Sequence, residues 1–380
     1  MSILIAPAAF KGSLTAGGAA AAMARGAHAA APHARVVQLP LADGGEGTAA
    51  AMAAASGGAL RAAWVEGPLG APVEAAYALL GDGVTAVVEM ATASGLWLLR
   101  REQYDAPRAS TYGTGQLIRA ALDAGCCRHL IVGVGGSATV DGGAGMAEAL
   151  GVRLLDHAGQ PIGRGGGGLA ALHRVDLSGR DPRLDAVEVT VACDVTNPLI
   201  GPGGAAAVFG PQKGASPEQV DLLERNLSHL ADVLRRDLGV RVADLPGAGA
   251  AGGLAAGLIA FLGARVASGF ETVAAAVGLV ERLDGCDLVL TGEGRVDGQT
   301  LSGKVIAGVA RAAASQGVPV VVLAGGVLPD AYALHERGVT ALFSIVPGPL
   351  ALEEAEGRAA ELIARCAEEV VRLWTRARAR

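Results

Sequence analysis

The fold is decided by one stretch of the chain, Cys286-Asp-Leu-Val-Leu-Thr-Gly-Glu-Gly-Arg-Val-Asp-Gly-Gln-Thr-Leu-Ser-Gly-Lys304. Residues 287–291 are a short apolar run bounded by Gly285 and Gly292, which predicts a parallel strand buried on both faces. Residues 305–313 have apolar side chains at helical spacing. We therefore expect a glycine-rich loop between a strand end and a helix start, where open α/β sheets bind ligands.

The expected loop carries two carboxylates, a guanidinium and an ammonium, contributed by Glu293, Arg295, Asp297 and Lys304. These groups suit chemistry on a negatively charged, metal-bound substrate. A solvated surface loop with incidental charges is the alternative. Residues 298–304 match the P-loop motif except at its last position, where Val305 replaces the required Ser or Thr. The loop is also too far from its strand for a P-loop. The stretch thus predicts phosphate-binding chemistry without the P-loop fold.

Composition narrows the class of protein. A chain of 380 residues with 51% apolar content exceeds the usual size of one domain, so we expect two. The net charge of −6 and the lack of a long basic run argue against nucleic-acid binding. The cysteines form no C-x-x-C pair and the histidines no H-x-x-x-H pair, which argues against a zinc site. We expect a cytoplasmic protein with free thiols and no secretory signal.

Residues 247–264 carry no charge and reach the lower limit for a membrane span. Their many glycines and alanines are only weakly apolar, and no second span exists, so we interpret residues 253–262 as a core helix.

Lysine is rare in this chain. Only three of the 31 basic residues are lysines, and each lies within one residue of a glycine: Lys11, Lys213 and Lys304. Where arginine can replace lysine this sequence uses arginine, so a surviving lysine marks a position that needs a compact ammonium. Lysine beside a backbone that can approach closely is a common pattern at phosphate sites. Chance retention is the alternative.

The first sixty residues predict strands at 2–6 and 35–39, with Lys11 in the loop after the first strand. The loop at 42–48 is rich in glycine, and its Asp43 and Glu46 could reach a metal or a hydroxyl, although a plain turn with a helix cap explains them equally. Strands at 318–324 and 341–346 resume this doubly wound pattern near the C-terminus.

The middle of the chain has a different pattern. Extended pieces at 73–80 and 84–90, separated by Gly81-Asp-Gly83, predict a hairpin and the beginning of another domain. A helix is expected at 116–124. The hydroxyls of residues 110–114 before it could contact the substrate, although N-capping by Thr114 explains them equally. Residues 217–238 predict a scaffold helix that begins with a capping box at Ser216.

A second glycine-rich loop follows the strand expected at residue 129. Gly133-x-Gly135-x-x-Ala138 imitates a dinucleotide fingerprint with Asp156 at the distance of a ribose contact, which keeps an NAD-dependent dehydrogenase as an alternative. A nest of backbone amides with Ser137 and Thr139, holding a carboxylate or phosphate, is the preferred interpretation.

A strand predicted at 187–192 ends in Cys193-Asp-Val-Thr-Asn-Pro-Leu199. Asp194 and Asn197 follow this strand end, which favours a general base and a group that positions it.

Taken together, these motifs resemble the bacterial glycerate kinase family, the type that phosphorylates D-glycerate with ATP. The resemblance covers nearly the whole chain in order, and it is carried by Phe10-Lys-Gly-Ser-Leu14, Leu41-Ala-Asp-Gly-Gly-Glu-Gly-Thr48, Thr111-Tyr-Gly-Thr-Gly115, Gly133-Val-Gly-Gly-Ser-Ala-Thr139, Asp141-Gly-Gly-Ala-Gly-Met146, Ala192-Cys-Asp-Val-Thr-Asn-Pro-Leu199, Phe209-Gly-Pro-Gln-Lys-Gly214 and Thr291-Gly-Glu-Gly-Arg-Val-Asp-Gly-Gln-Thr300.

The resemblance implies two interleaved α/β domains with the active site in the cleft between them. Residues 1–62 plus 268–380 would form a Rossmann-like domain with a mostly parallel sheet, and residues 63–267 an inserted mixed α/β domain. It implies D-glycerate and ATP as substrates, with 2-phosphoglycerate as the product. A homodimer is possible in this family, and neither nucleic acid nor a membrane is an expected partner.

On this basis we assign expected roles. The catalytic groups are Asp194, Asp297 and Lys11, where either aspartate is the base that accepts the hydroxyl proton. The nucleotide or phosphate groups are Gly135, Gly136, Ser137, Lys213 and Lys304. Arg295, Asn197 and Asp43 bind substrate, and Glu293 with Asp194 holds Mg²⁺.

One departure from the family pattern stands near the N-terminus. The family commonly reads Ala-Pro-Asp-Ser-Phe-Lys, whereas Ala8 and Ala9 precede Phe10 here. If the missing acid binds metal or substrate in relatives, this chain has reduced activity, a shifted substrate or an engineered change. A glycerate-binding protein without catalysis and a kinase that forms 3-phosphoglycerate stay open as alternatives.

Overall fold

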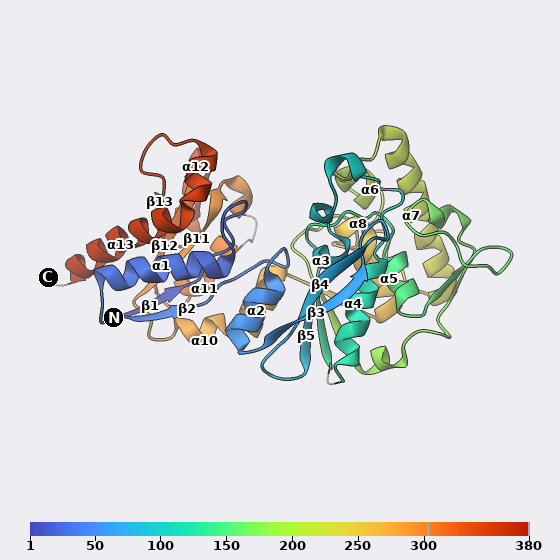
Figure 1. The fold of residues 1–380 in the computed structure, drawn as a ribbon, viewed down its shortest axis with the longest axis horizontal. Helices are drawn as coiled ribbons and strands as arrows, with labels where there is room; N and C mark the ends of the chain where they lie inside the picture. Colours follow the sequence, from blue (N-terminus) through green and yellow to red (C-terminus); the bar gives the residue numbers. More distant parts are fainter. Residues whose placement is uncertain (126, 302–304, 379–380) are drawn as a thin grey trace. The chain divides into compact units, whose positions relative to one another are not determined.

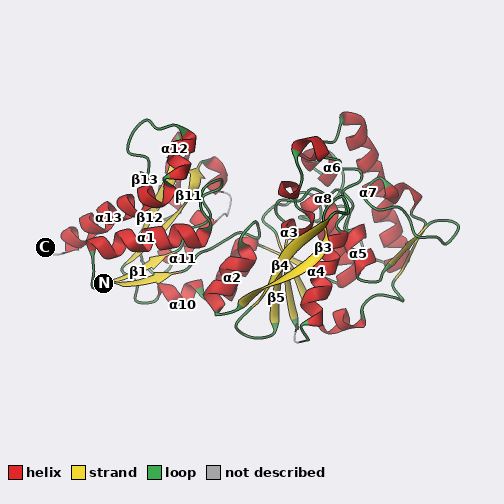
Figure 2. Cartoon of the chain, viewed as in Figure 1, coloured by secondary structure: helices red, strands yellow, loops and turns green. Residues whose placement is uncertain are grey.

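The computed structural model describes residues 1–125, 127–301 and 305–378. The chain divides into two compact units, which we treat separately: unit 1 comprises Met1–Asp43 with Phe270–Arg380, and unit 2 comprises Gly44–Gly269. Figures 1 and 2 show that each unit has strands at its centre and helices around them. Unit 1 is built from both ends of the chain, whereas unit 2 is one continuous segment.

Unit 1 contains a five-stranded sheet in the order β13-β12-β11-β1-β2, and each neighbouring pair is parallel. Its elements are β1 (Ser2–Ile5), α1 (Ala16–Ala30), β2 (Arg35–Gln38), α10 (Leu279–Leu283), β11 (Leu288–Val296), η6 (Gly298–Leu301), α11 (Val305–Ala314), β12 (Val320–Val327), η7 (Pro329–Arg337), β13 (Val339–Ser344), α12 (Leu352–Gly357) and α13 (Ala359–Arg378), and α9 (Gly269–Ala276) begins at the boundary between the units. The doubly wound pattern expected from the sequence is confirmed.

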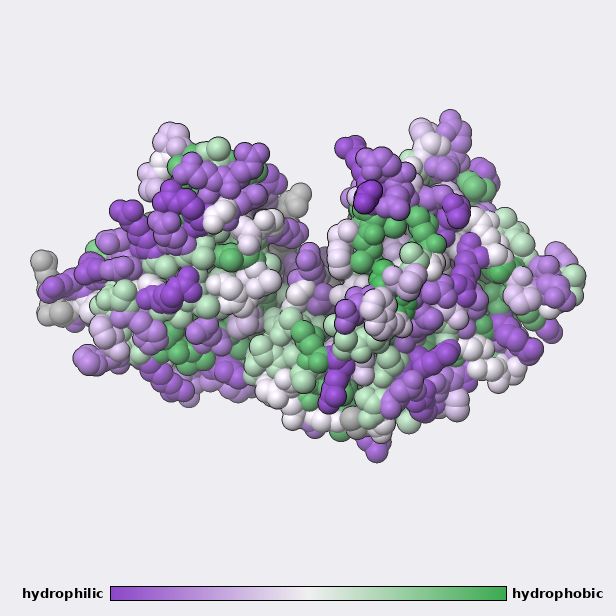
Figure 3. All heavy atoms as spheres, viewed as in Figure 1, coloured by the Kyte–Doolittle hydropathy of each residue, from purple (hydrophilic) through white to green (hydrophobic). Residues whose placement is uncertain are grey.

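Helices cover both faces of this sheet. Helices α1 and α13 lie side by side on one face, over Ile3, Ile5 and Leu290. Helix α11 and η7 pack on the other face, over Val322 and Ala324. Successive side chains of a strand point to opposite faces, and both faces of this sheet are covered by helices. A central strand such as β12 is therefore expected to have no polar side chains, and its sequence, Val-Val-Val-Leu-Ala-Gly-Gly-Val, has none. The face of the molecule drawn in Figure 3 is hydrophilic over α12 and α13, whose charged residues point away from this core.

Unit 2 contains a mixed six-stranded sheet in the order β10-β9-β6-β5-β4-β3. Strands β5, β6, β9 and β10 are parallel, and β3 and β4 are antiparallel additions at one edge. Its elements are α2 (Thr48–Ser56), β3 (Ala59–Glu66), β4 (Pro72–Leu79), β5 (Thr85–Glu89), α3 (Ala91–Ser94), η1 (Leu96–Leu98), η2 (Arg101–Gln103), α4 (Tyr112–Asp123), β6 (His129–Gly133), α5 (Ala144–Ala149), β7 (Arg153–Leu155), η3 (Gly168–Ala171), β8 (Arg174–Asp176), η4 (Pro182–Ala186), β9 (Glu188–Ala192), α6 (Ala205–Phe209), η5 (Pro211–Lys213), α7 (Pro217–Leu238), α8 (Ala250–Leu262) and β10 (Arg265–Ala267).

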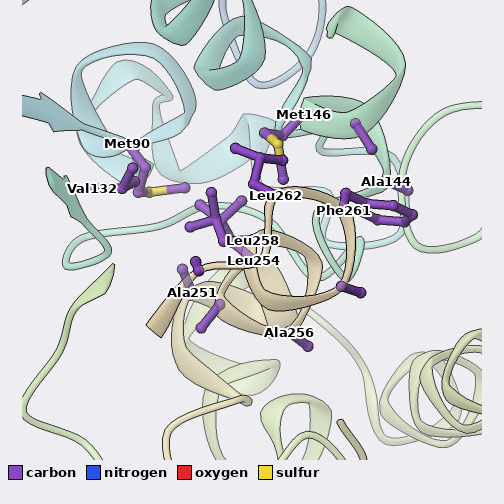
Figure 4. Packing of buried hydrophobic residues seen from close by; sticks show 14 of the residues in the cluster. Met90, Val132, Ala144, Met146, Ala251, Leu254, Ala256, Leu258, Phe261 and Leu262 are labelled. Atoms are coloured by element: carbon purple, nitrogen blue, oxygen red, sulfur yellow. The ribbon is translucent and has the colours of Figure 1, made fainter. Parts of the chain in front are cut away.

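The core helix expected at 253–262 within the uncharged segment corresponds to α8 (Ala250–Leu262), whose backbone is non-helical at residues 251–253. In α8 the apolar side chains of Leu254, Leu258 and Phe261 are buried, and Figure 4 shows them in one cluster with Met90 and Val132 of the strand region. Among the described residues, no helix is both long and apolar enough to cross a membrane.

The sequence-based prediction of a helix at 116–124 places the start of the helix too late. Helix α4 begins at Tyr112, and Thr111 is its N-cap residue. Thr114 lies inside the helix, where its hydroxyl is buried and hydrogen-bonded to the Ser94 hydroxyl at 2.8 Å. The glycines at 113 and 115 disguised the first turn: at Gly113 a β-carbon would lie 1.8 Å from the carbonyl oxygen of Glu66, so close packing requires glycine in this helix.

Candidate functional site

In unit 1, the residues that follow β1 run beside the end of β11. The Ala8 N–H donates to the Gly292 carbonyl at 2.9 Å, and the Thr291 hydroxyl donates to the Ala6 carbonyl at 2.7 Å. A β-carbon on Gly294 would lie 3.4 Å from the Lys11 backbone nitrogen, so the two segments stay close up to Lys11. The exposed ammonium of Lys11 therefore belongs to the carboxyl edge of the parallel sheet, where such sheets bind ligands.

Glu293 and Arg295 do not lie in a loop, which corrects the expectation from the sequence. Strand β11 continues to Val296 because β12 pairs with it along its whole second half, with Glu293 opposite Ala324 and Arg295 opposite Gly326. The apolar run that suggested a strand end at Thr291 marks only the part buried on both faces. Beyond it, polar residues still make ladder hydrogen bonds at the carboxyl edge.

Three charged groups lie at the end of β11. Glu293 and Arg295 are two positions apart in the strand and therefore point to the same face, and Asp297 follows the last strand residue, Val296. The Arg295 Nε lies 3.4 Å from Asp297 Oδ2. Arg295 is largely exposed, while Asp297 is mostly covered. A guanidinium that faces solvent is suited to bind an anionic ligand.

Thr300 is a site residue that the sequence reasoning missed. Its side chain is buried, and its hydroxyl donates to Glu293 Oε1 at 2.8 Å and accepts from the Asp297 N–H at 3.3 Å. The turn of η6 is held further by Asp330, which accepts from the Gly298 N–H at 2.9 Å. Only the match of Thr300 to a family motif signalled its importance, because a single threonine in a loop has no distinctive spacing.

Asp43 lies at the same edge of unit 1. The Leu39 N–H donates to the Ile5 carbonyl and the Leu41 N–H to the Pro7 carbonyl, so the residues after β2 run along those after β1. Asp43 follows directly and is partly exposed. Unit 1 thus gathers Lys11, Asp43 and the charged end of β11 at one edge of its sheet. Lys304 lies outside the described residues.

In unit 2, Asp194 follows β9 at the carboxyl edge of the parallel strands. Its Oδ1 accepts from the Ser268 hydroxyl at 2.8 Å and from the Gly269 N–H at 2.9 Å, both just after β10. Asn197 shapes the same loop, since its side-chain amide donates to the Gly203 carbonyl at 2.8 Å. The structure therefore places Asp194 where the sequence predicted, and adds Ser268 as a partner that the sequence reasoning missed.

The loop after β6 lies at the same edge. Gly136 has a φ of +73°, and a β-carbon on Gly135 would lie 2.9 Å from the Gly45 Cα, so both positions require glycine. Lys213 contacts this loop from η5. Its ammonium donates to the Ser137 hydroxyl and to the Thr139 carbonyl, both at 2.7 Å, and only 1% of the residue is exposed. Burial lowers the pKa of Lys213 to about 7.

Two buried acids hold the neighbouring loops, and the sequence reasoning assigned a role to neither. Asp141 accepts from the Thr111 N–H and hydroxyl and from the N–H groups of Gly143 and Gly145. Glu89, the last residue of β5, accepts from the backbone N–H groups of Gly47 and Ala49 at the start of α2. Burial raises the pKa of both carboxyls. Their hydrogen bonds make them supports for the loops.

The dinucleotide alternative is not supported by this geometry. The fingerprint needs a helix immediately after the strand, but α5 begins only at Ala144. Asp156 follows β7 in a separate two-stranded sheet, and its carboxylate accepts from the backbone N–H groups of Ala158 and Gln160.

The described residues contain no cluster of three or more His, Cys, Asp or Glu side chains that could enclose a metal ion. Mg²⁺ does not need such a cluster, because it usually binds through one or two carboxylates together with substrate phosphates and water. The Glu293 carboxylate, whose orientation Thr300 fixes, is a suitable ligand of this kind.

Comparison with known proteins agrees with this arrangement. The model of the glycerate kinase family matches residues 3–375. The chain is 51% identical to the glycerate kinase of Bacillus subtilis and 49% identical to the glycerate 2-kinase of Escherichia coli, over 97% of each sequence in both cases. A crystal structure of a putative glycerate kinase 2 from Salmonella typhimurium superposes with a TM-score of 0.90 at 47% identity and covers all of both chains. The chain therefore belongs to the glycerate kinase family, and it is an ATP-dependent kinase.

Proposed function

We propose that this protein transfers the γ-phosphate of ATP to the 2-hydroxyl of D-glycerate and forms 2-phosphoglycerate. The observation that carries the proposal is the chain's 49% identity to a glycerate 2-kinase over 97% of both sequences. The positions of several charged groups support it: Lys11 and Arg295 in unit 1, and Asp194 in unit 2, follow or end parallel strands at the carboxyl edge. We also propose that residues 1–62 with 268–380 belong to a Rossmann-like α/β domain, and residues 63–267 to an inserted α/β domain.

Phosphoryl transfer requires positioning and neutralisation of charge more than covalent chemistry. Lys11 and Lys304 contact the phosphates in this proposal, and Arg295 binds the carboxylate of glycerate through its planar fork. Asn197 and Asp43 orient the substrate, while the loop with Gly135, Gly136 and Ser137 receives an anionic group. Mg²⁺, when bound by Glu293 and Asp194, would supply further neutralisation of the triphosphate.

The proton of the reacting hydroxyl needs an acceptor, and Asp194 and Asp297 are the two candidates. The position of Asp297, 3.4 Å from the Arg295 guanidinium, supports it as the base, because a glycerate held by Arg295 would present its 2-hydroxyl nearby. In this proposal Asp194 acts on the metal. A homodimer and a cytoplasmic location stay predictions.

The decisive experiment is a coupled assay of ADP release with D-glycerate, followed by NMR of the product. Phosphorus–proton coupling distinguishes 2-phosphoglycerate from 3-phosphoglycerate. D-lactate, which lacks the 3-hydroxyl, is the matched control, since it is accepted only if the 2-hydroxyl reacts. Binding of glycerate without ADP release would identify a non-catalytic protein, the outcome suggested by Ala8.

A further inference from the structure

While Lys213 is protonated, its buried contact fixes the direction of one hydroxyl proton. An ammonium can only donate hydrogen bonds, so Ser137 Oγ must be the acceptor in its 2.7 Å contact with Lys213 Nζ. The Ser137 hydroxyl proton therefore points to another partner. Ser137 is buried to 9% exposure, at the border of solvent. A hydroxyl that accepts from a cation is also a stronger donor, and this suits an anionic oxygen.

A second hydroxyl on this loop, that of Thr139, has no hydrogen-bond partner among the described residues. Thr139 is fully buried. Buried hydroxyls are nearly always paired, so an orphan indicates a ligand or water that completes the site. The Thr139 carbonyl, in contrast, is used by Lys213.

The backbone that carries Thr139 packs closely against the first residues of α8. A β-carbon on Gly252 would lie 1.9 Å from the Thr139 carbonyl oxygen, and the Gly142 N–H donates to the Gly252 carbonyl at 3.0 Å. The neighbouring Ala251 has a φ of 54°, a conformation that costs free energy for a residue with a β-carbon. Such strain at a close contact is typical of a preorganised binding loop.

We propose that Lys213 is a positioning residue that turns the Ser137 hydroxyl outward, so that it donates to an anionic oxygen of a substrate. This inference rests on the proposed function, and it changes the expected role of Lys213 from a direct phosphate contact to an indirect one. The anionic oxygen belongs to an ATP phosphate or to the carboxylate of glycerate. The experiment below distinguishes these two sources.

The inference has a signature in pH. Two effects act on the pKa of Lys213. Burial is the larger effect and lowers this pKa to about 7, whereas the nearby Asp141 carboxylate raises it. A neutral amine can accept a hydrogen bond from Ser137, which turns the hydroxyl proton back toward the lysine. Ligand affinity should therefore fall as the pH rises through this pKa.

Calorimetric binding of Mg·ATP and of D-glycerate, each alone, tests the inference with Ser137→Ala, Lys213→Met and the double variant. For one of the two ligands, each single variant should weaken binding about tenfold or more, the usual effect of losing a hydrogen bond to a charged group. The double variant should be no weaker than Ser137→Ala, since both changes remove the same contact. Ser315→Ala, at an exposed serine after α11, is the matched control.

The pH series completes the test. From about pH 6 to about pH 8.5 the wild-type affinity should fall, and that of Ser137→Ala should stay level. Additive losses, an unchanged affinity in Ser137→Ala, or a pH dependence that survives in this variant would each overturn the inference. If Lys213→Met does not fold, the comparison of wild type with Ser137→Ala decides alone. Binding needs no turnover, so a protein that shows this pattern without releasing ADP would contradict only the proposed function.

Discussion

The Thr300 hydroxyl donates a hydrogen bond to Glu293 Oε1 at 2.8 Å, and this bond sets the direction of the carboxylate that we propose as a metal ligand. Thr300→Val removes the donor and keeps the shape of the side chain. We expect the Mg²⁺ concentration for half-maximal activity to rise roughly 10- to 100-fold, as for other partners of metal ligands. Thr300→Ser should restore most of the affinity, and Thr375→Val near the C-terminus should change nothing. An unaltered Mg²⁺ dependence in Thr300→Val would contradict the metal role of Glu293.

The two aspartates can be separated by their kinetics. Asp297→Asn removes the proposed base and should lower kcat roughly 10²- to 10⁴-fold with little change in the Mg²⁺ requirement. Asp194→Asn should lower kcat and also raise the Mg²⁺ requirement. The reverse pattern would exchange their roles, and near-full turnover in both variants would refute the assignment.

Lys11 is expected to need its compact ammonium. Lys11→Met removes a positive charge beside the triphosphate and should lower kcat about 10²-fold or more. Lys11→Arg keeps the charge but changes its shape, so we expect only partial activity, as measured by ADP release at saturating ATP. Arg376→Met, at the exposed end of α13, controls for net charge. Full activity in Lys11→Met would exclude a role in phosphate binding.

Two glycines of helix α1 form a matched pair for stability. A β-carbon on Gly26 would lie 2.0 Å from the Ala364 carbonyl oxygen of α13, whereas Gly17 has nothing within 4 Å. Gly26→Ala should destabilise the protein by about 1–3 kcal/mol through overpacking. Gly17→Ala should stabilise it by about 0.5–1 kcal/mol through helix propensity. Urea unfolding measures both, and equal effects would show that α1 and α13 do not pack this closely.

Lys213 also makes stability depend on pH. Its pKa falls from 10.5 to about 7 on folding, so between these values the unfolded chain binds more protons than the folded one. Stability therefore rises with pH across this window. Between about pH 7 and pH 9, wild type should gain on the order of 1–2 kcal/mol relative to Lys213→Met in urea unfolding. A constant difference between the two proteins would mean that folding does not lower the pKa of Lys213.

The sequence predicted the architecture well because the apolar runs of parallel strands are continuous and glycines mark their ends. It failed where tertiary contacts override local signals. Strand β11 extends past Thr291 because β12 supplies partners for Glu293 and Arg295, and no local pattern encodes this pairing. Helix α4 begins at Tyr112 because Thr111 is held by the distant Asp141.

The residues of the candidate site could also be predicted only where a local sequence signal marks them. Charged residues at strand ends, such as Asp194 and Lys11, could be predicted because the position after a parallel strand is itself informative. The supports Ser268 and Glu89 could not be predicted, because each contacts a residue that is far away in the sequence. Thr300 could not be predicted either, because its contact with Glu293 depends on the turn that follows β11. The burial of Lys213 was equally invisible, since a lysine between glutamine and glycine reads as exposed.

The interleaved chain has a consequence for how the protein is made on the ribosome. Residues 44–269 form a continuous unit and can fold as soon as they emerge, since domains generally fold as units during synthesis. Strand β1 pairs with β11, and α1 packs on α13, so the first segment synthesised waits for the last. The nascent N-terminal strand, Ser2–Ile5, must remain unpaired on that side until Leu288–Leu290 have been translated, and a truncation before Leu288 would leave that side exposed to aggregation.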